Sequence, residues 1–369
     1  MIPVNSISLN GKEKKYLNEC IDSNWISTGG KFNDLFEDKI RKLIKKKFCI
    51  SVTSGTTALE TAIQSLNLKK GDEVILPSFT IISCFNAIVK NGLVPIPVDC
   101  NFNDWNMDIS EVKKKITKKT KAIIVVHIYG LASNIKKITS LKRKHNFKII
   151  EDAAEVIGLK YFDNKFCGYY GDITTFSFYA NKHITTGEGG MVLTNDKKIF
   201  NRCKSIINLF FKQPRFIHDE IGSNFRFTNL QAAVGLAQFE NLKKTIKKKR
   251  QIGNIYQKGL DGIKNIYLPL KKNNFSKNIY WVFGIVLKTG NRTNREDICK
   301  KLFKKGIETR PFFWPIHKQP VFKPFQKKKK MHLKNSEYIA KNGFYLPSGT
   351  ALKVKQIKYI IHELKKILK

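Results

Sequence analysis

Five short apolar runs recur through the first 150 residues of this chain, and segments with a helical pattern separate them. The runs are residues 49–52, 73–76, 94–98, 122–126 and 148–150. Within residues 57–66, Leu59, Ile63 and Leu66 recur at the three- and four-residue spacing of one helix face. Buried strands that alternate with helices are typical of a mostly parallel sheet covered on both faces. The sequence therefore predicts an α/β fold.

The pattern changes after a long helical segment at residues 229–250. Beyond it, residues 279–287 have the aromatic and β-branched content of a strand, and further helical patterns follow. A length of 369 residues is also long for one compact domain. We therefore predict a large domain over residues 1–249 and a smaller C-terminal α+β domain over residues 250–369. The later helices are expected at residues 295–302, 338–343 and 356–368.

The net charge of +39 is an unusual feature of the composition. Only nine of the 68 basic residues are Arg, whereas proteins that read nucleic acids usually use the forked Arg guanidinium. The lysines also fall in short runs spread along the chain, at residues 45–47, 113–115, 247–249 and 327–330. We expect these runs to lie on solvated faces and predict no specific nucleic-acid partner.

Seven cysteines are scattered singly, without any C-x-x-C pair. This spacing is typical of free thiols in a reducing cytoplasm, and it favours neither a disulfide framework nor a metal site. No apolar run approaches the ~20 residues that span a bilayer. The first ten residues also lack the basic and apolar regions of a secretory signal. We therefore expect a cytoplasmic protein without a membrane segment.

Residues 178–190 hold one lysine, Lys182, between an aromatic run and a glycine-rich turn. About thirty residues upstream, Asp152 follows the apolar run at 148–150. A lysine that can form a Schiff base and an aspartate that can keep a pyridine nitrogen protonated are the two groups that pyridoxal phosphate (PLP) chemistry needs. Each residue also has a structural explanation, because Asp152 could cap a helix and Lys182 is one of 59 lysines.

Residues 54–57, Ser-Gly-Thr-Thr, follow a predicted strand and begin a predicted helix. A helix N-terminus presents free N–H groups to an anion, and the glycine allows a tight turn. The same four residues could be an ordinary N-cap. Ser177 lies where it could add a further contact to a phosphate.

With these features together, the chain resembles the DegT/DnrJ/EryC1/StrS aminotransferases. These are PLP enzymes of the aspartate-aminotransferase fold (fold type I) that aminate nucleotide-linked keto-sugars. The resemblance covers nearly the whole chain. Its motifs lie at residues 25–29, 54–59, 71–77, 151–155, 177–190, 222–231, 310–317 and 346–349.

The resemblance implies a role for each matching residue around the cofactor. Lys182 would be the catalytic residue and hold PLP through a Schiff base, and Asp152 would pair with the protonated ring nitrogen. Glu155 would lie near the ring. Ile81 stands where many relatives stack an aromatic side chain on the ring, so aliphatic packing would replace stacking here. The phosphate would contact Ser54, Gly55, Thr56 and Ser177.

The resemblance also implies a homodimer with shared active sites, because Asn224 would reach the phosphate of the neighbouring subunit's cofactor. Segments near residue 25 and residue 317 resemble those that border the sugar nucleotide. The residues expected on the substrate side are Trp25, Ser27, Thr28, His183, Arg226, Phe313 and His317.

The presence of Lys182 favours amine transfer, since a branch of the family that removes a 3-hydroxyl carries His at that position. Residues 176–191, 218–231 and 310–321 most resemble the branch that aminates C4 of GDP-4-keto-6-deoxy-D-mannose with L-glutamate as donor. Such products often enter surface polysaccharides. Three alternatives stay open: a UDP- or dTDP-linked sugar or amination at C3, a sugar 3-dehydratase, and a PLP-binding regulator that contacts nucleic acid.

Overall fold

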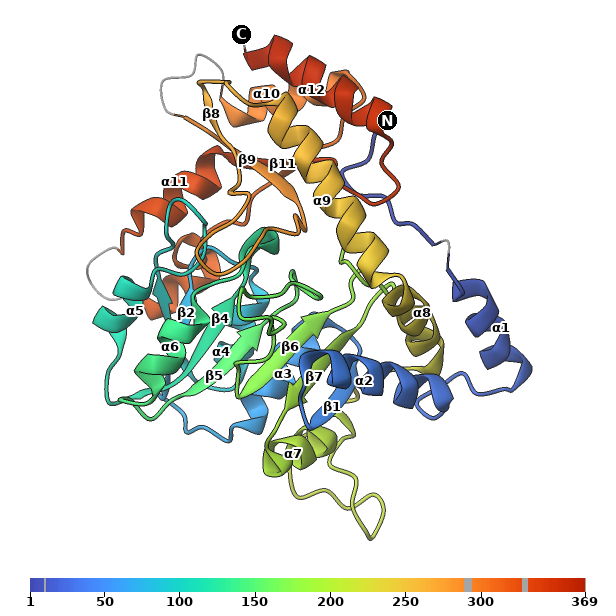
Figure 1. The fold of residues 1–369 in the computed structure, drawn as a ribbon. Coiled ribbons are helices and arrows are strands. Elements are labelled where there is room, and N and C mark those ends of the chain that lie inside the picture. Colours follow the sequence, from blue (N-terminus) through green and yellow to red (C-terminus); the bar gives the residue numbers. More distant parts are fainter. Residues whose placement is uncertain (10, 289–293, 327–330, 369) are drawn as a thin grey trace.

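In the computed structural model, which describes residues 1–9, 11–288, 294–326 and 331–368, a seven-stranded sheet forms the centre of the protein (Figure 1). The strand order is β1-β7-β6-β5-β4-β2-β3, and β7 alone runs opposite to the other six. The prediction of an α/β fold with a mostly parallel sheet is confirmed. The strands are β1 (Phe48–Val52), β2 (Glu73–Pro77), β3 (Val94–Val98), β4 (Thr120–Val126), β5 (Lys148–Asp152), β6 (Ile173–Ser177) and β7 (Gly190–Thr194).

Helices cover both faces of this sheet, as the continuous apolar runs predicted. On β2, Val74 and Leu76 join one core cluster while Ile75 joins the other. The first cluster includes side chains of α3 (Gly55–Ser65), α4 (Ser83–Lys90) and α7 (Lys197–Ile207). The second includes side chains of α1 (Glu13–Asp22), α2 (Lys31–Ile44), α5 (Ile109–Lys115), α6 (Ile135–Lys142) and α8 (Asn229–Glu240). A short 3-10 turn, η1 (Ile128–Gly130), follows β4.

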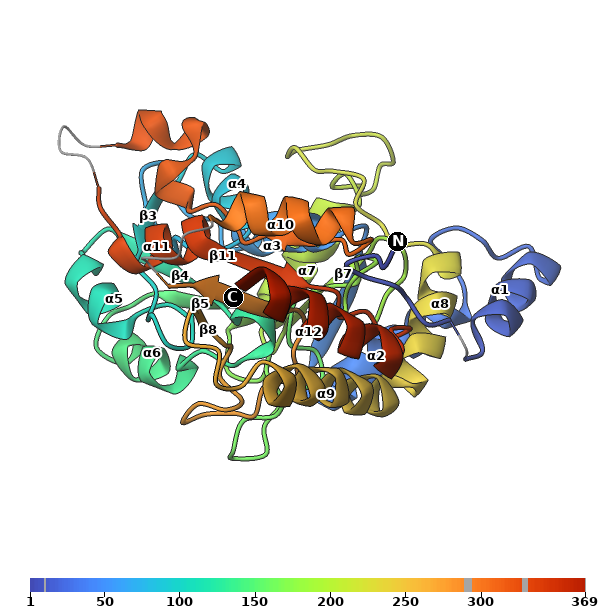
Figure 2. The same ribbon diagram turned by 90° about the horizontal axis from the view of Figure 1, so that it is seen from above.

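A second, antiparallel sheet with the order β10-β11-β9-β8 lies in the C-terminal part of the chain. Two helices of this part, α10 and α12, lie side by side over it, together with the end of α9 (Figure 2). These elements share a third core cluster around Phe283 and Phe344. The bounds are α9 (Leu242–Gly259), β8 (Ile266–Tyr267), β9 (Phe283–Leu287), α10 (Arg295–Lys304), β10 (Arg310–Pro311), η2 (Ile316–Lys318), η3 (Pro320–Phe325), α11 (Lys334–Asn342), β11 (Gly343–Leu346) and α12 (Val354–Leu368).

The predicted division into residues 1–249 and 250–369 stays a prediction. Two features of the structure connect the two parts. The position 249/250 falls inside α9, which runs from one part of the molecule to the other (Figure 1). The first residues of the chain lie against the C-terminal part, because the Ile2 N–H donates to Gly306 O at 2.6 Å and the Glu308 N–H donates to Ile2 O at 3.0 Å.

Three details of the sequence interpretation need correction. The helix predicted at 229–250 is two helices, because the backbone of Asn241 departs from helical geometry between α8 and α9. The helix predicted at 338–343 begins earlier, at Lys334, and ends before Gly343, which starts β11. Two lysines of the supposedly solvated runs are buried: Lys46, which donates to Gly171 O, and Lys249. The run at 327–330 lies outside the described residues.

The remaining composition-based expectations concern cysteines and membranes. All seven cysteines are free thiols; six are buried, and Cys299 is partly exposed. No described helix has the length and apolar content to cross a bilayer. Within the same part of the chain, no cluster of His, Cys, Asp and Glu side chains is arranged to bind a metal ion.

Candidate active site

A cavity of about 350 Å³ lies at the carboxyl ends of β4, β5 and β6, a usual location for ligands in open α/β sheets. The start of α3 forms another wall. Three aromatic side chains from the C-terminal part of the chain close the cavity, so both parts contribute to it. The lining residues are Ser54, Gly55, Thr56, Leu59, Ile81, Ser83, Val126, Asp152, Ala154, Glu155, Ser177, Tyr179, Asn181, Lys182, Glu188, Trp281, Phe313 and Tyr345.

Lys182 extends into this cavity from the turn between β6 and β7. Its side chain is 10% exposed, and its Nζ atom lies 4.0 Å from Oε1 of Glu155. Burial lowers the pKa of Lys182, while the nearby carboxylates of Glu155 and Asp152 act in the opposite direction. Burial raises the pKa of Glu155, against the effect of the Lys182 charge. The Lys182 ammonium group therefore loses its proton at a lower pH than an exposed lysine does, which favours the neutral, nucleophilic amine.

Asp152 ends β5 and presents its carboxylate to the same cavity. One oxygen accepts the Ala154 N–H at 3.1 Å, and the other accepts the Cys84 thiol at 3.6 Å. Burial raises the pKa of Asp152, since few donors replace the lost water. A protonated ring nitrogen facing this carboxylate would supply a charge-assisted hydrogen bond and restore its ionised state.

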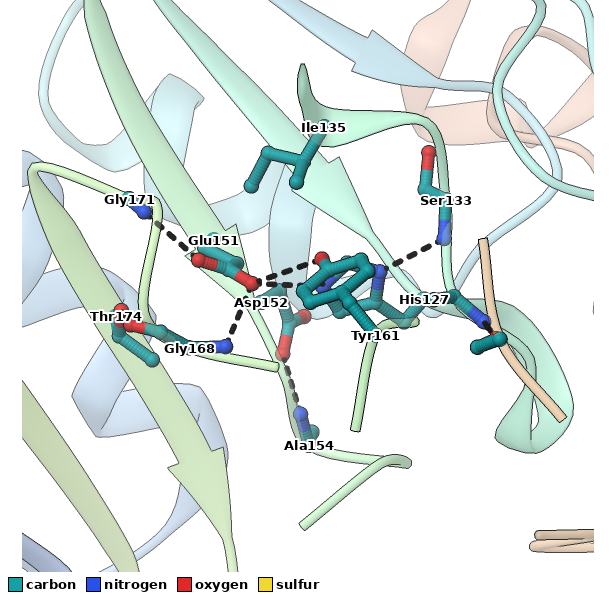
Figure 3. Close-up of polar contacts among 12 residues, drawn as sticks. His127, Ser133, Ile135, Glu151, Asp152, Ala154, Tyr161, Gly168, Gly171 and Thr174 are labelled. Carbon is teal, nitrogen blue, oxygen red and sulfur yellow. Dashed lines mark hydrogen bonds and ion pairs between the residues drawn. The ribbon is translucent and has the colours of Figure 1, made fainter. Parts of the chain in front are cut away.

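A buried polar network holds the end of β5 from behind. Glu151, whose side chain points to the opposite face of the sheet from Asp152, accepts hydrogen bonds from His127, Tyr161, Gly168 and Gly171 (Figure 3). Burial alone would raise the pKa of Glu151, but the hydrogen bonds from His127 and Gly168 bring it below its ordinary value.

The tautomer of His127 follows from its partners. Nδ1 accepts the Ser133 N–H at 3.0 Å, so the ring proton is on Nε2, which donates to Oε1 of Glu151 at 3.0 Å. The ring is therefore neutral and Glu151 is the acceptor. This arrangement fixes the strand end that carries Asp152.

The start of α3 has the free N–H groups and hydroxyl groups that could bind an anion. The Ser54 side chain caps the helix by accepting the Thr57 N–H at 3.1 Å, which leaves the N–H groups of Gly55 and Thr56 without an acceptor in the helix. A Cβ atom at Gly55 would lie 2.6 Å from Cβ of Ser177, so only glycine permits this approach. The hydroxyl groups of Thr56 and Ser83 lie 2.8 Å apart at the same place.

These three places match the three recognised parts of PLP. The phosphate fits the helix start with its hydroxyl groups, the ring nitrogen fits Asp152, and the aldehyde carbon fits Lys182. Glu155 and Ile81 also line the cavity, and their expected positions beside the cofactor ring stay predictions. The residues present therefore fit the cofactor.

Several residues expected on the substrate side do not line the cavity of their own chain. Trp25 is 60% exposed, and Thr28 and Arg226 line a separate groove of about 470 Å³. Asn224 accepts a hydrogen bond from Nε of Arg226 at 2.9 Å. Ser27 provides a backbone acceptor for the Asn229 N–H. Phe313 does line the cavity. The expected roles of the other residues in substrate and cofactor binding stay predictions.

The two histidines expected near the substrate are buried outside the cavity lining. Nδ1 of His317 lies 2.7 Å from Oγ of Ser78, and its Nε2 lies 3.0 Å from Oε1 of Glu337, so both nitrogens are already engaged. His183 is 2% exposed, and burial lowers its pKa to about 3, so it is neutral. Neither ring lines the cavity in this single chain.

The sequence interpretation missed other cavity residues. Trp281 and Tyr345 come from the C-terminal part of the chain, and only the fold brings them to Lys182. Ser83 and Tyr179 were also missed, although both adjoin predicted site segments. A strand was expected at 279–287, but nothing local to it indicated a site.

Comparison with known proteins agrees with this geometry. A GDP-perosamine synthase from Escherichia coli O157:H7 is 41% identical, over 98% of this chain and 97% of the relative. A GDP-perosamine synthase from Vibrio cholerae is 40% identical, over 99% and 98%. The predicted likeness of this chain to one branch of the family is therefore confirmed, and the relatives of that branch are named GDP-perosamine synthases.

Solved structures also share the fold. A variant of GDP-4-keto-6-deoxymannose-3-dehydratase (ColD) with bound GDP-perosamine superposes with a TM-score of 0.91 at 25% identity, over 99% of this chain and 100% of that one. An E. coli GDP-4-keto-6-deoxy-D-mannose-3-dehydratase with bound hydrated PLP has a TM-score of 0.90 at 25% identity, over 99% of both chains. The predicted fold of PLP-dependent transferases is confirmed. The DegT/DnrJ/EryC1/StrS aminotransferase family matches over residues 8–365, and the chain belongs to that family.

Proposed function

We propose that this aminotransferase uses PLP to move the amino group of L-glutamate to C4 of GDP-4-keto-6-deoxy-D-mannose, giving GDP-perosamine. The proposal rests mainly on one observation. The nearly buried amine of Lys182 shares a cavity with Asp152 and with the helix start that could bind a phosphate. The likeness to relatives named GDP-perosamine synthase supports the choice of sugar nucleotide.

Each wall of the cavity has a task in this reaction. When bound, PLP supplies an electron sink that stabilises negative charge on the carbon beside the transferred nitrogen. Asp152 would keep the ring nitrogen protonated, and the start of α3 with Ser177 would anchor the phosphate. Lys182 takes a proton at Nζ from one carbon and returns it to another, because its lowered pKa suits proton transfer in both directions. Glu155, 4.0 Å away, balances the charge that forms on this amine.

The proposed enzyme is a homodimer. The segment between α7 and α8 projects from the body of the molecule (Figure 1), and it exposes Phe216, Ile217 and Ile221 by 72%, 59% and 90%. Large apolar side chains this exposed favour an interface. Asn224 lies in the same segment, and in the dimer it would contact the cofactor phosphate of the neighbouring subunit.

A subunit-mixing experiment tests this shared site. Lys182→Ala and Asn224→Ala subunits are each impaired alone, but a mixed dimer contains one intact site. After unfolding and refolding of an equal mixture, random pairing should restore about a quarter of wild-type activity. Activity no higher than the mean of the two separate variants would show that Asn224 serves its own subunit.

Absorbance spectroscopy tests the proposed reaction in two halves. Protein loaded with PLP should lose its visible cofactor band when L-glutamate is added and regain it when GDP-4-keto-6-deoxy-D-mannose follows. A band that glutamate removes and this sugar does not restore would contradict the substrate, and UDP- or dTDP-linked keto-sugars would then be tried. A protein that takes up no PLP would contradict the whole proposal.

A second candidate activity is removal of the 3-hydroxyl from the same sugar, because ColD has the same fold. Lys182 favours amine transfer over this reaction. Mass spectrometry separates the two, since a 3-deoxy product lacks one oxygen and contains no added nitrogen.

A further inference from the structure

An aromatic ring from the C-terminal part of the chain faces the Lys182 amine. Nζ of Lys182 lies 3.7 Å from the centre of the Trp281 ring, well inside the ~6 Å range of cation–π contacts. Trp281 is 5% exposed and precedes β9, about 100 residues downstream of the lysine. The ring therefore contacts the atom that performs the proposed chemistry.

This contact matters because Nζ has few other partners. It makes no hydrogen bond to any described residue, and the nearest carboxylate oxygen, on Glu155, is 4.0 Å away. Burial disfavours an ammonium group, and an aromatic face is one of the few surroundings that favours it without donating or accepting a proton. The indole can therefore hold the charged amine without competing for its proton.

The indole is also held in place on several sides. Its Nε1–H donates to Asn181 O at 2.9 Å, beside the lysine. The backbone carbonyl of Trp281 accepts a hydrogen bond from the buried Lys249 at 2.7 Å. The ring packs against Tyr129 and Phe313, with centroid distances of 5.8 and 6.4 Å. An aromatic surface fixed in this way needs no rearrangement to receive the amine.

We propose that Trp281 is a further catalytic residue, whose indole face holds the Lys182 ammonium group whenever that amine is not bonded to the cofactor. This inference rests on the proposed function. During turnover the amine must leave the cofactor, carry a proton and return. The indole face keeps it at the cavity wall, within reach of Glu155, and raises the share of the protonated form.

The test measures the pKa of Lys182 in cofactor-free protein. Trace acetic anhydride labels the amine at a series of pH values, excess deuterated reagent labels the rest after unfolding, and mass spectrometry of the peptide carrying Lys182 gives the ratio. Trp281→Leu, which removes the aromatic face, should lower the pKa of Lys182 by about one unit. Trp281→Phe, which keeps an aromatic face, should lower it by less than half as much.

A matched control is Trp105→Leu. Trp105 is also 5% exposed, packs in an edge-on contact with Tyr129, and does not line the cavity. This variant should leave the pKa of Lys182 unchanged, which separates loss of the aromatic face from general loosening of the core. In enzyme loaded with PLP, Trp281→Leu should also shift the acidic limb of the pH profile of kcat to lower pH. A residue that served only in packing would not produce this shift.

Three results would overturn the inference. They are an unchanged or raised pKa of Lys182 in Trp281→Leu, an equal decrease in Trp281→Leu and Trp281→Phe, and an equal decrease in Trp105→Leu. The labelling needs neither cofactor nor substrate, so it gives an answer even if the proposed amine transfer is wrong.

Discussion

The substitution Glu151→Gln tests the donor and acceptor roles in the network behind Asp152. In the structure, Glu151 accepts every hydrogen bond that it makes in this network. Oε1 of Glu151 accepts hydrogen bonds from Nε2 of His127 at 3.0 Å, from Tyr161 at 3.2 Å and from the Gly168 N–H at 2.6 Å. Oε2 accepts the Gly171 N–H at 2.7 Å. All four partners are donors, so the site has no place for an NH₂ group.

The expected cost follows from counting donors. The Gln amide oxygen can replace Oε1 and keep three hydrogen bonds, but its NH₂ group must then face the Gly171 N–H. Two buried donors are left without acceptors, at about 1–3 kcal/mol each, and the three remaining bonds lose the strengthening effect of the charge. We therefore expect a loss of about 3–4 kcal/mol in the free energy of unfolding.

Equilibrium urea denaturation measures this loss as a lower midpoint with an unchanged slope. The matched control is Glu296→Gln, since Glu296 is 70% exposed and should show no measurable change. The pH dependence of the urea midpoint gives a second readout. The pKa of Glu151 is lowered in the folded protein, so its stabilising effect is present above the ordinary value of 4.5 and is lost as pH falls below it. A loss below about 1 kcal/mol at neutral pH would refute the assigned polarity.

Three further predictions concern the cavity and its surroundings. Lys182→Ala should reduce amine transfer at least about 10³-fold with the fold retained, and stopped-flow assays with circular dichroism would check both. Gly55→Ala should weaken PLP binding at least about tenfold, because the added Cβ would lie 2.6 Å from Cβ of Ser177; fluorescence titration measures it, and unchanged affinity would contradict the anion site. Burial lowers the pKa of Lys249 to about 7. Between pH 7 and about 10.5 the folded protein therefore binds fewer protons than the unfolded chain, so the free energy of unfolding should rise with pH in this range. Lys249→Met should reduce that rise in urea midpoints measured at pH 6.5 and 9.

The sequence predicted features that depend on local pattern. The apolar runs at 94–98 and 122–126 are β3 and most of β4, because strands buried on both faces of a sheet need continuous apolar residues. Lys182 and Asp152 were identifiable for a similar reason. Asp152 ends β5 and Lys182 lies in the turn that follows β6, and the carboxyl ends of neighbouring parallel strands meet at one edge of the sheet.

Features that depend on distant contacts could not be predicted. Trp281 reaches Lys182 only after the C-terminal part of the chain folds over the sheet. Lys249 looks like its exposed neighbours in the same basic run, but the fold turns its side chain toward the carbonyl groups of Trp281 and Ser348. The expected roles of Asn224 and Arg226 stay predictions, because they concern a second subunit that a single sequence does not place. The short break at Asn241 also gave no signal, since both flanking segments favour helix.

The most direct test of the account is transfer of a labelled amino group. Purified protein with PLP is incubated with ¹⁵N-labelled L-glutamate and GDP-4-keto-6-deoxy-D-mannose, and the sugar nucleotides are analysed by mass spectrometry. We expect a GDP-linked amino sugar that carries ¹⁵N and is absent with the Lys182→Ala variant. A product without ¹⁵N, or an equal yield from Lys182→Ala, would contradict the assignment of Lys182 and of the cavity around it.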